Sequence, residues 1–138
     1  MVGIVVCKIR SVGLMQNKLF LLLASVSGFL GVVLGAFGAH GLKTRVSEEL
    51  LVVWHTGVSY QMYHSLALLV VGCMILQWPA IKLFRITGWL FIAGIVIFSG
   101  SLYLLTLSGV RMWGAVTPIG GLAFLAAWVT LFIGILQL

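Results

Sequence analysis

The stretch WHTGVSYQMYH, from Trp54 to His64, concentrates polar and aromatic side chains in a chain that is otherwise largely aliphatic. It contains two histidines, two tyrosines, a glutamine and a tryptophan. Polar side chains are costly inside a membrane helix unless other helices or water satisfy their hydrogen bonds. The stretch therefore predicts a region of the fold where such partners come together.

Composition indicates an integral membrane protein. The chain has 138 residues, of which 62% are hydrophobic and only 7% are charged, whereas about a quarter of a soluble domain is charged. Its length allows about four spans of roughly 20 residues with short loops. We expect an all-α fold, an antiparallel four-helix bundle that forms one membrane domain over residues 19–138.

Apolar runs set the expected spans. They cover about residues 19–39, 59–77, 87–107 and 118–137. Ser47, followed by Glu48 and Glu49, is typical of a helix start. A straight helix from there to residue 78 would be about 46 Å long, which exceeds the hydrocarbon thickness. We therefore expect a short interfacial helix over residues 48–56 and a bend near Gly57. Thr117 and Pro118 are predicted to cap and to begin the fourth span.

The first residues form a tail over residues 1–18. Met15 precedes a polar run and then a clean span, so we expect that Met15 could be the natural start and the preceding residues an extension. Two cysteines do not make a disulfide framework or a metal motif. Cys7 lies in the tail, and Cys73 is expected to be a small buried apolar residue of the second span.

Small residues predict surfaces of close helix packing. They recur on one face of the first span and at the start of the fourth, where they let a neighbouring backbone approach. The residues are Gly28, Gly31, Gly35, Gly38, Gly120 and Gly121. Gly31 and Gly35 also form a GxxxG pair, for which packing within one bundle is favoured over dimerisation.

Polar residues gather toward one membrane face. In an antiparallel bundle, the end of the first span lies beside the starts of the second and fourth and the end of the third. The candidate polar cluster there is His40, Tyr60, Gln61, His64, Ser99, Ser101, Tyr103, Thr106 and Thr117. Bonds from His64, Gln61 and Tyr60 to Ser99, Ser101 or the Thr117 region are expected to hold this half together, and the opposite half is expected to be aliphatic.

Four motifs in order resemble one family. They are GAFGAHG at 35–41, W-x-T-x3-Y-Q-x2-H at 54–64, FSGSLY at 98–103 and TPIGG at 117–121. Together they resemble the YgdD/YwdK-like family, small inner-membrane proteins known only as a domain of unknown function. The resemblance covers about residues 15–138 and implies a four-span bacterial inner-membrane protein without an established activity. The tail before Met15 departs from the short N-terminus of that family.

Three functional hypotheses remain open. The favoured one is a non-enzymatic subunit or assembly partner, because the sequence shows no nucleophile–base pair, phosphate loop or carboxylate within a span. A channel or carrier could use the polar half, with His64 as a proton-sensitive group. A metal or cofactor could bind through His40, His55 and His64. We predict no catalytic residue, metal or cofactor; the expected partners are the bilayer, other membrane proteins or a second copy.

Basic residues indicate orientation. The net charge is +6, and the lysines and arginines lie singly or in pairs in loops, as expected for anionic headgroups and not for nucleic acid. One end of the bundle has Lys8, Arg10, Lys18, Lys82 and Arg85, and the other has Lys43, Arg45 and Arg111. The richer end is expected in the cytoplasm together with both termini. Without the first fourteen residues, the two ends have equal numbers of basic residues.

Overall fold

The computed structural model describes the backbone of residues 2–138 and the side chains of residues 18–138. Its elements are α1 (Val2–Ala36), η1 (Phe37–Leu42), α2 (Glu48–Gln77), α3 (Lys82–Gly94), η2 (Ile95–Ser99), α4 (Gly100–Ser108) and α5 (Met112–Ile135). The two η segments are π-helical and continue their neighbours without a break. Four helical stretches are therefore long and apolar enough to cross a membrane: Lys18–Leu42, Glu48–Gln77, Lys82–Ser108 and Met112–Ile135.

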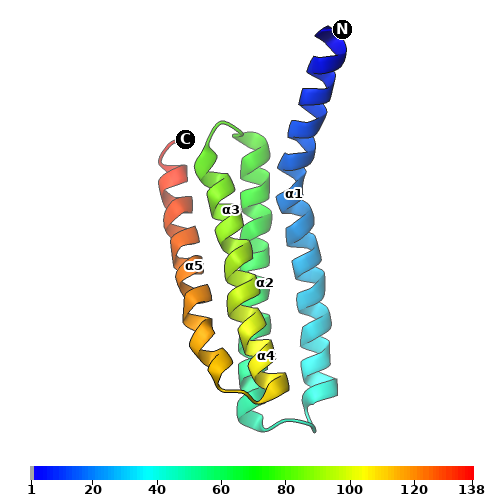
Figure 1. Ribbon diagram of the computed structural model, residues 1–138, viewed down its shortest axis with the longest axis vertical. Helices are drawn as coiled ribbons and strands as arrows, with labels where there is room; N and C mark the ends of the chain where they lie inside the picture. Colours follow the sequence, from blue (N-terminus) through cyan, green and yellow to red (C-terminus); the bar gives the residue numbers. More distant parts are fainter. Residues whose placement is uncertain (1) are drawn as a thin grey trace.

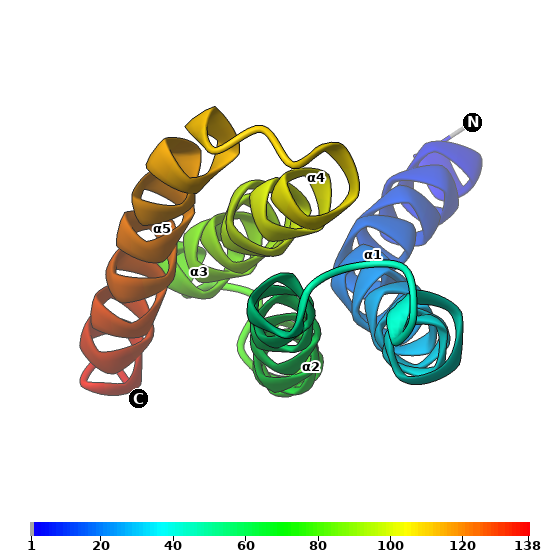
Figure 2. The ribbon, with the colours of Figure 1, turned by 90° about the horizontal axis from the view of Figure 1, so that it is seen from below.

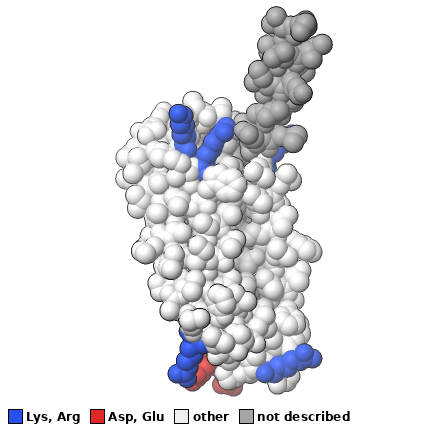
Figure 3. All heavy atoms as spheres, viewed as in Figure 1, with Lys and Arg blue, Asp and Glu red and all other residues white. Residues whose placement is uncertain are grey.

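The four stretches run side by side and alternate in direction, which confirms the antiparallel bundle (Figure 1). Viewed from one end, α1 and α5 lie at the two edges, with α2 and the α3–α4 stretch between them (Figure 2). α1 packs mainly along α2, α5 packs along α3, and α2 joins the two pairs. Lysines and arginines lie at both ends of the bundle, and the face between them is free of charge (Figure 3).

The expected interfacial helix over residues 48–56 is not a separate element. α2 is continuous from Glu48 to Gln77, with Ser47 accepting a hydrogen bond from the Leu50 amide as expected of a cap. The helix continues through Gly57, which is buried against Tyr103 and Leu102 of α4. Neighbouring helices thus support the first turns of α2 from the side.

The fourth span begins earlier than its Thr117–Pro118 pair suggested. α5 starts at Met112, after Gly109 turns the chain with a φ of 68°, and Pro118 lies inside the helix. Proline removes one backbone donor from a helix, but a threonine hydroxyl can bond a carbonyl of the turn before it. The Thr117 hydroxyl donates to the Trp113 carbonyl at 3.4 Å, so Thr117 acts within the helix and not as its cap.

The half of the bundle near Lys82 contains most of the apolar core. Its centre is formed by Phe20, Leu68, Val71, Phe84 and Phe91. This half was expected to be aliphatic, but it also contains a polar pair. The hydroxyls of Thr87 and Thr130 lie 2.9 Å apart and join α3 to α5. Both threonines also bond a carbonyl of their own helix, which lowers the cost of burying them.

Cys73 faces outward and is exposed, contrary to the expected burial. Its neighbour Gly72 takes the inward position against Leu21 of α1. Cys7 and the expected start at Met15 lie outside the residues whose side chains the structure describes.

The small residues of α1 and η1 mostly pack against α2. A Cβ added at Gly31 would lie 2.5 Å from the Met62 sulfur, and one at Gly38 would lie 2.5 Å from the Trp54 ring. Gly35 faces Val58. The GxxxG pair is therefore occupied within the chain, as expected. Gly28 is different, because no atom lies within 4 Å of its added Cβ.

Candidate functional site

Gln61 is the centre of the polar cluster. Its Oε1 accepts a 2.8 Å hydrogen bond from the Tyr103 hydroxyl of α4, and its Nε2 donates at 2.8 Å to the Ser27 carbonyl of α1. Gln61 is buried, with 5% of its surface exposed. One side chain of α2 thus joins three of the four spans, and both ends of its amide are used.

Serines extend this network on both sides of α2. Ser65 donates to the Ser27 hydroxyl at 2.7 Å, a second bond between α1 and α2. Ser99, the last residue of η2, donates to the Gly57 carbonyl at 2.8 Å. π-helical turns recur at functional positions in helices, and here one ends at a serine that bonds the neighbouring span.

Ser101 and Thr117 connect the third and fourth spans, since their hydroxyls lie 2.8 Å apart. Near the loop ends, Thr106 of α4 bonds the Leu50 carbonyl at 3.2 Å. The indole N–H of Trp54 donates to the Leu34 carbonyl of α1 at 2.9 Å. Every span therefore bonds at least one neighbour in this half, and no buried side-chain nitrogen or oxygen among the described residues lacks a partner.

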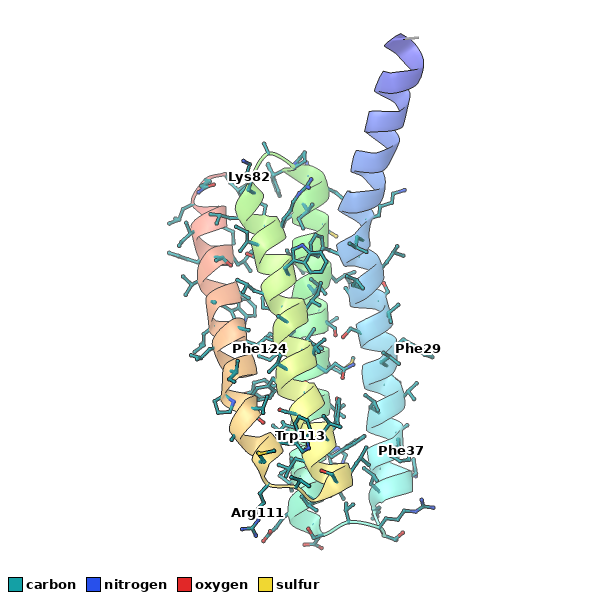
Figure 4. All side chains as sticks on the ribbon, in the orientation of Figure 1. Phe29, Phe37, Lys82, Arg111, Trp113 and Phe124 are labelled. Atoms are coloured by element: carbon teal, nitrogen blue, oxygen red, sulfur yellow. The ribbon has the colours of Figure 1, made fainter. Side chains whose placement is uncertain are left out.

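His64 and Tyr60 form a separate, aromatic group and do not bond the serines, contrary to expectation. His64 Nδ1 lies 2.8 Å from the Tyr60 carbonyl, and the indole of Trp128 points at His64 Nε2 from 3.4 Å. The imidazole stacks on Phe124, with ring centroids 3.5 Å apart. Figure 4 shows Phe124 between α5 and the neighbouring helices.

The aromatic group lines an open groove between α2 and α5. The Tyr60 ring stacks on Phe98 of η2 with centroids 4.5 Å apart. The groove holds about 550 Å³, within the range of roughly 300–1,000 Å³ that is usual for small-molecule sites. Its lining is Tyr60, His64, Phe98, Pro118, Gly121, Leu122, Phe124, Leu125 and Trp128.

The three histidines do not converge. His40 in η1 and His55 in α2 are both exposed, and His64 lies about 13 Å further along α2 than His55 by helical rise. Among the described residues, no group of three or more histidine, cysteine, aspartate or glutamate side chains could hold a metal ion. His40 was grouped with the polar cluster from its place at a helix end, but its side chain is exposed and bonds none of the other members.

Four participants were missing from the predicted cluster. Ser27 and Ser65 are absent from the predicted cluster, although Ser27 accepts from Gln61 and Ser65 bonds the Ser27 hydroxyl. Trp54 was quoted in the defining stretch but not expected to donate across to α1. Trp128 is likewise absent from the predicted cluster, and its indole N–H points at His64. Ser65 lies one helical turn after Gln61 on the same face of α2, which is the signal in the sequence that points to it.

Comparison with known proteins gives a consistent result. Residues 34–121 match the sequence model of a protein family that is described as protein of unknown function (DUF423). The UPF0382 membrane protein YwdK of Bacillus subtilis is 46% identical over 84% of this chain and 94% of its own length. A UPF0382 membrane protein of Staphylococcus haemolyticus is 47% identical over 84% of this chain and 93% of its length.

The relatives are named as membrane proteins, in agreement with the four apolar spans. None of these names assigns an enzymatic activity. No solved structure matches the chain. All four of the sequence motifs that resemble the family lie within the matched region. The protein is therefore a membrane protein that belongs to the DUF423 family of unknown function.

Proposed function

We propose that this protein is a non-catalytic subunit or assembly partner of a larger complex in the bacterial inner membrane. The proposal rests on a groove that its own bundle leaves unfilled. The groove lies between α1 and α2, holds about 350 Å³ and has Gly28 in its wall. Small residues such as Gly28 let a second helix approach closely in a membrane, so a transmembrane helix of another protein fits this surface.

The position of α1 supports the same proposal. Of its most apolar stretch, 17% is buried, compared with 39% for α2. Phe29 projects from the outer side of α1 and is 68% exposed (Figure 4). An edge helix with one main neighbour has room for a second neighbour that this chain does not supply.

The bonding pattern favours a structural role over conduction. Gln61, Ser99 and Ser101 each bond a carbonyl or side chain within the bundle. A path for a solute or proton would need such groups to exchange partners with the moving species. In the half near Lys82, the Thr87–Thr130 pair is likewise bonded within the bundle.

Site-specific photocrosslinking in native membranes tests the partner role. A benzoylphenylalanine at Phe29 should give a discrete adduct with another protein, whose mass and peptides identify the partner. The matched control replaces Phe132 of α5, which is 63% exposed, and should give none. Adducts with lipid alone at both positions would contradict the proposal, and an adduct of twice the chain mass would replace the partner by a second copy.

We also propose that both termini lie in the cytoplasm. Lys8, Arg10, Lys18, Lys82 and Arg85 precede or follow spans at one end, and basic residues favour the cytoplasmic side. The test introduces Ala80→Cys or Ser108→Cys after both native cysteines are replaced by serine. A membrane-impermeant maleimide on intact spheroplasts should label Ser108→Cys and should reach Ala80→Cys only after lysis. The reverse pattern would invert the topology.

A further inference from the structure

We propose that the groove between α2 and α5 binds an uncharged ring lipid, a quinol or its quinone. This inference does not depend on the partner role proposed above. It concerns the opposite side of α2, where Tyr60, His64, Phe98, Phe124 and Trp128 line a space of about 550 Å³.

The depth of the groove decides the charge of its occupant. His64 lies about 24 Å from the start of α2 and about 20 Å from its end by helical rise. The hydrocarbon core is about 30 Å thick, so the groove opens within it. A charged group is costly at that depth. A neutral ring with oxygen substituents fits, whereas a lipid with a charged or strongly hydrated head belongs at the interface.

Two polar atoms in the groove are available to such a ring. The Tyr60 hydroxyl is hydrogen-bonded by no residue among 18–138, and Tyr60 is 40% exposed. It can donate to a ring carbonyl or accept from a ring hydroxyl. The hydrocarbon contains no water to bond an exposed polar group, so a bound lipid would supply the partner of this hydroxyl.

His64 provides the second atom. A carbonyl can only accept, so the 2.8 Å contact with the Tyr60 carbonyl assigns the proton to Nδ1 in the neutral ring. Nε2 is then an acceptor that faces the Trp128 N–H at 3.4 Å, longer than the usual 2.9–3.0 Å for such a bond. A quinol hydroxyl could donate to Nε2 in place of this weak contact.

The walls of the groove suit a flat ring. His64 stacks on Phe124 at an interplanar angle of 8°, and Tyr60 stacks on Phe98 at 22°. Aromatic rings favour stacked and edge-to-face arrangements with one another, and the half-exposed Trp128 adds a further ring to the lining of the groove. Leu122 and Leu125 continue the groove toward lipid, where an isoprenoid tail would lie.

Photolabelling tests the site directly. The purified full chain, in phosphatidylcholine nanodiscs, is irradiated with a decyl-substituted azidobenzoquinone, with or without 2-methyl-1,4-naphthoquinone as competitor. Labelling that the competitor removes should map to peptides containing residues 60–64 and 118–128. Labelling spread over the exposed leucines of every helix, and unaffected by the competitor, would overturn the proposal.

Matched variants separate binding from folding. Tyr60→Phe removes only a hydroxyl that no described residue bonds, and should lower competable labelling about fivefold, as expected for one lost hydrogen bond. His64→Leu should do the same. Tyr63→Phe and His55→Leu change exposed residues outside the groove and should leave labelling unchanged. If His64→Leu does not fold, Tyr60→Phe decides alone, and wild-type labelling in that variant refutes the site.

Discussion

The Tyr103 hydroxyl donates a 2.8 Å hydrogen bond to Oε1 of Gln61, and so joins α4 to α2. Because the Gln61 amide also donates to the Ser27 carbonyl of α1, this one residue of α2 connects α1 with α4. Hydrogen bonds between membrane helices average about 0.6 kcal/mol. Their effect here depends on several bonds that share one side chain.

We predict that Gln61→Leu lowers the free energy of unfolding by about 1–2 kcal/mol, since it removes two interhelical bonds and leaves the Tyr103 hydroxyl unpaired. The measurement is the midpoint of unfolding by sodium dodecyl sulfate in mixed micelles. Tyr103→Phe should cost less, and the double variant should show a coupling of about 0.6 kcal/mol. Strictly additive effects would mean that the bond contributes nothing to stability.

Much of the fold could be predicted from the sequence, because bilayer thickness and apolar run length determine the spans. The continuity of α2 through Gly57 could not, because it goes with contacts to the third span: Gly57 packs against α4 and Leu50 accepts a hydrogen bond from Thr106. The start of α5 was misplaced for a similar reason. Thr117 and Pro118 have the local pattern of a helix start, but the helix already begins at Met112, and Thr117 bonds the Trp113 carbonyl one turn before it.

Sequence position indicates how deep in the bundle each polar side chain lies, but not which side chain it contacts. Depth follows from sequence position along each span, which is why Gln61, Tyr103, Ser101 and Thr117 lie in the same half. The rotation of each helix about its axis follows from packing, and it decides whether His64 meets a serine or, as here, Phe124. The exposure of Cys73 beside the buried Gly72 has the same origin.

A second prediction concerns Trp54, which is 1% exposed and donates to the Leu34 carbonyl of α1. Trp54→Phe keeps an aromatic ring beside Tyr103 but loses the indole N–H, and should destabilise the bundle by about 1 kcal/mol. Thermal unfolding in detergent, followed by gel filtration, would show a lower midpoint. The control is Trp78→Phe at an exposed position, and equal midpoints for the two variants would count against a role for the Leu34 bond.

A third prediction concerns the Thr87–Thr130 pair in the apolar half. Thr87→Val should cost about 0.5–1 kcal/mol, because it leaves the Thr130 hydroxyl without its interhelical partner. Replacing both threonines by valine should be nearly neutral, since removing both partners leaves no unpaired group between the helices. Detergent unfolding of the two single variants and the double variant checks this order. A double variant less stable than either single one would show that the threonines act independently.

The last prediction uses the contact between Gly120 and Phe98. A Cβ at Gly120 would collide with the backbone of η2 at Phe98, with the Phe98 Cα only 2.7 Å away, and a backbone cannot move aside as a side chain can. Gly120→Ala should therefore force α5 away from η2 and lower the unfolding midpoint strongly, by about 2 kcal/mol or more in free energy, as overpacking does. Gly100→Ala is the control, because no atom lies within 4 Å of its added Cβ. Alanine there should be neutral or stabilising by about 0.5–1 kcal/mol, through helix propensity alone. If both variants unfold like the wild type, α5 and η2 do not pack as closely as the structure places them.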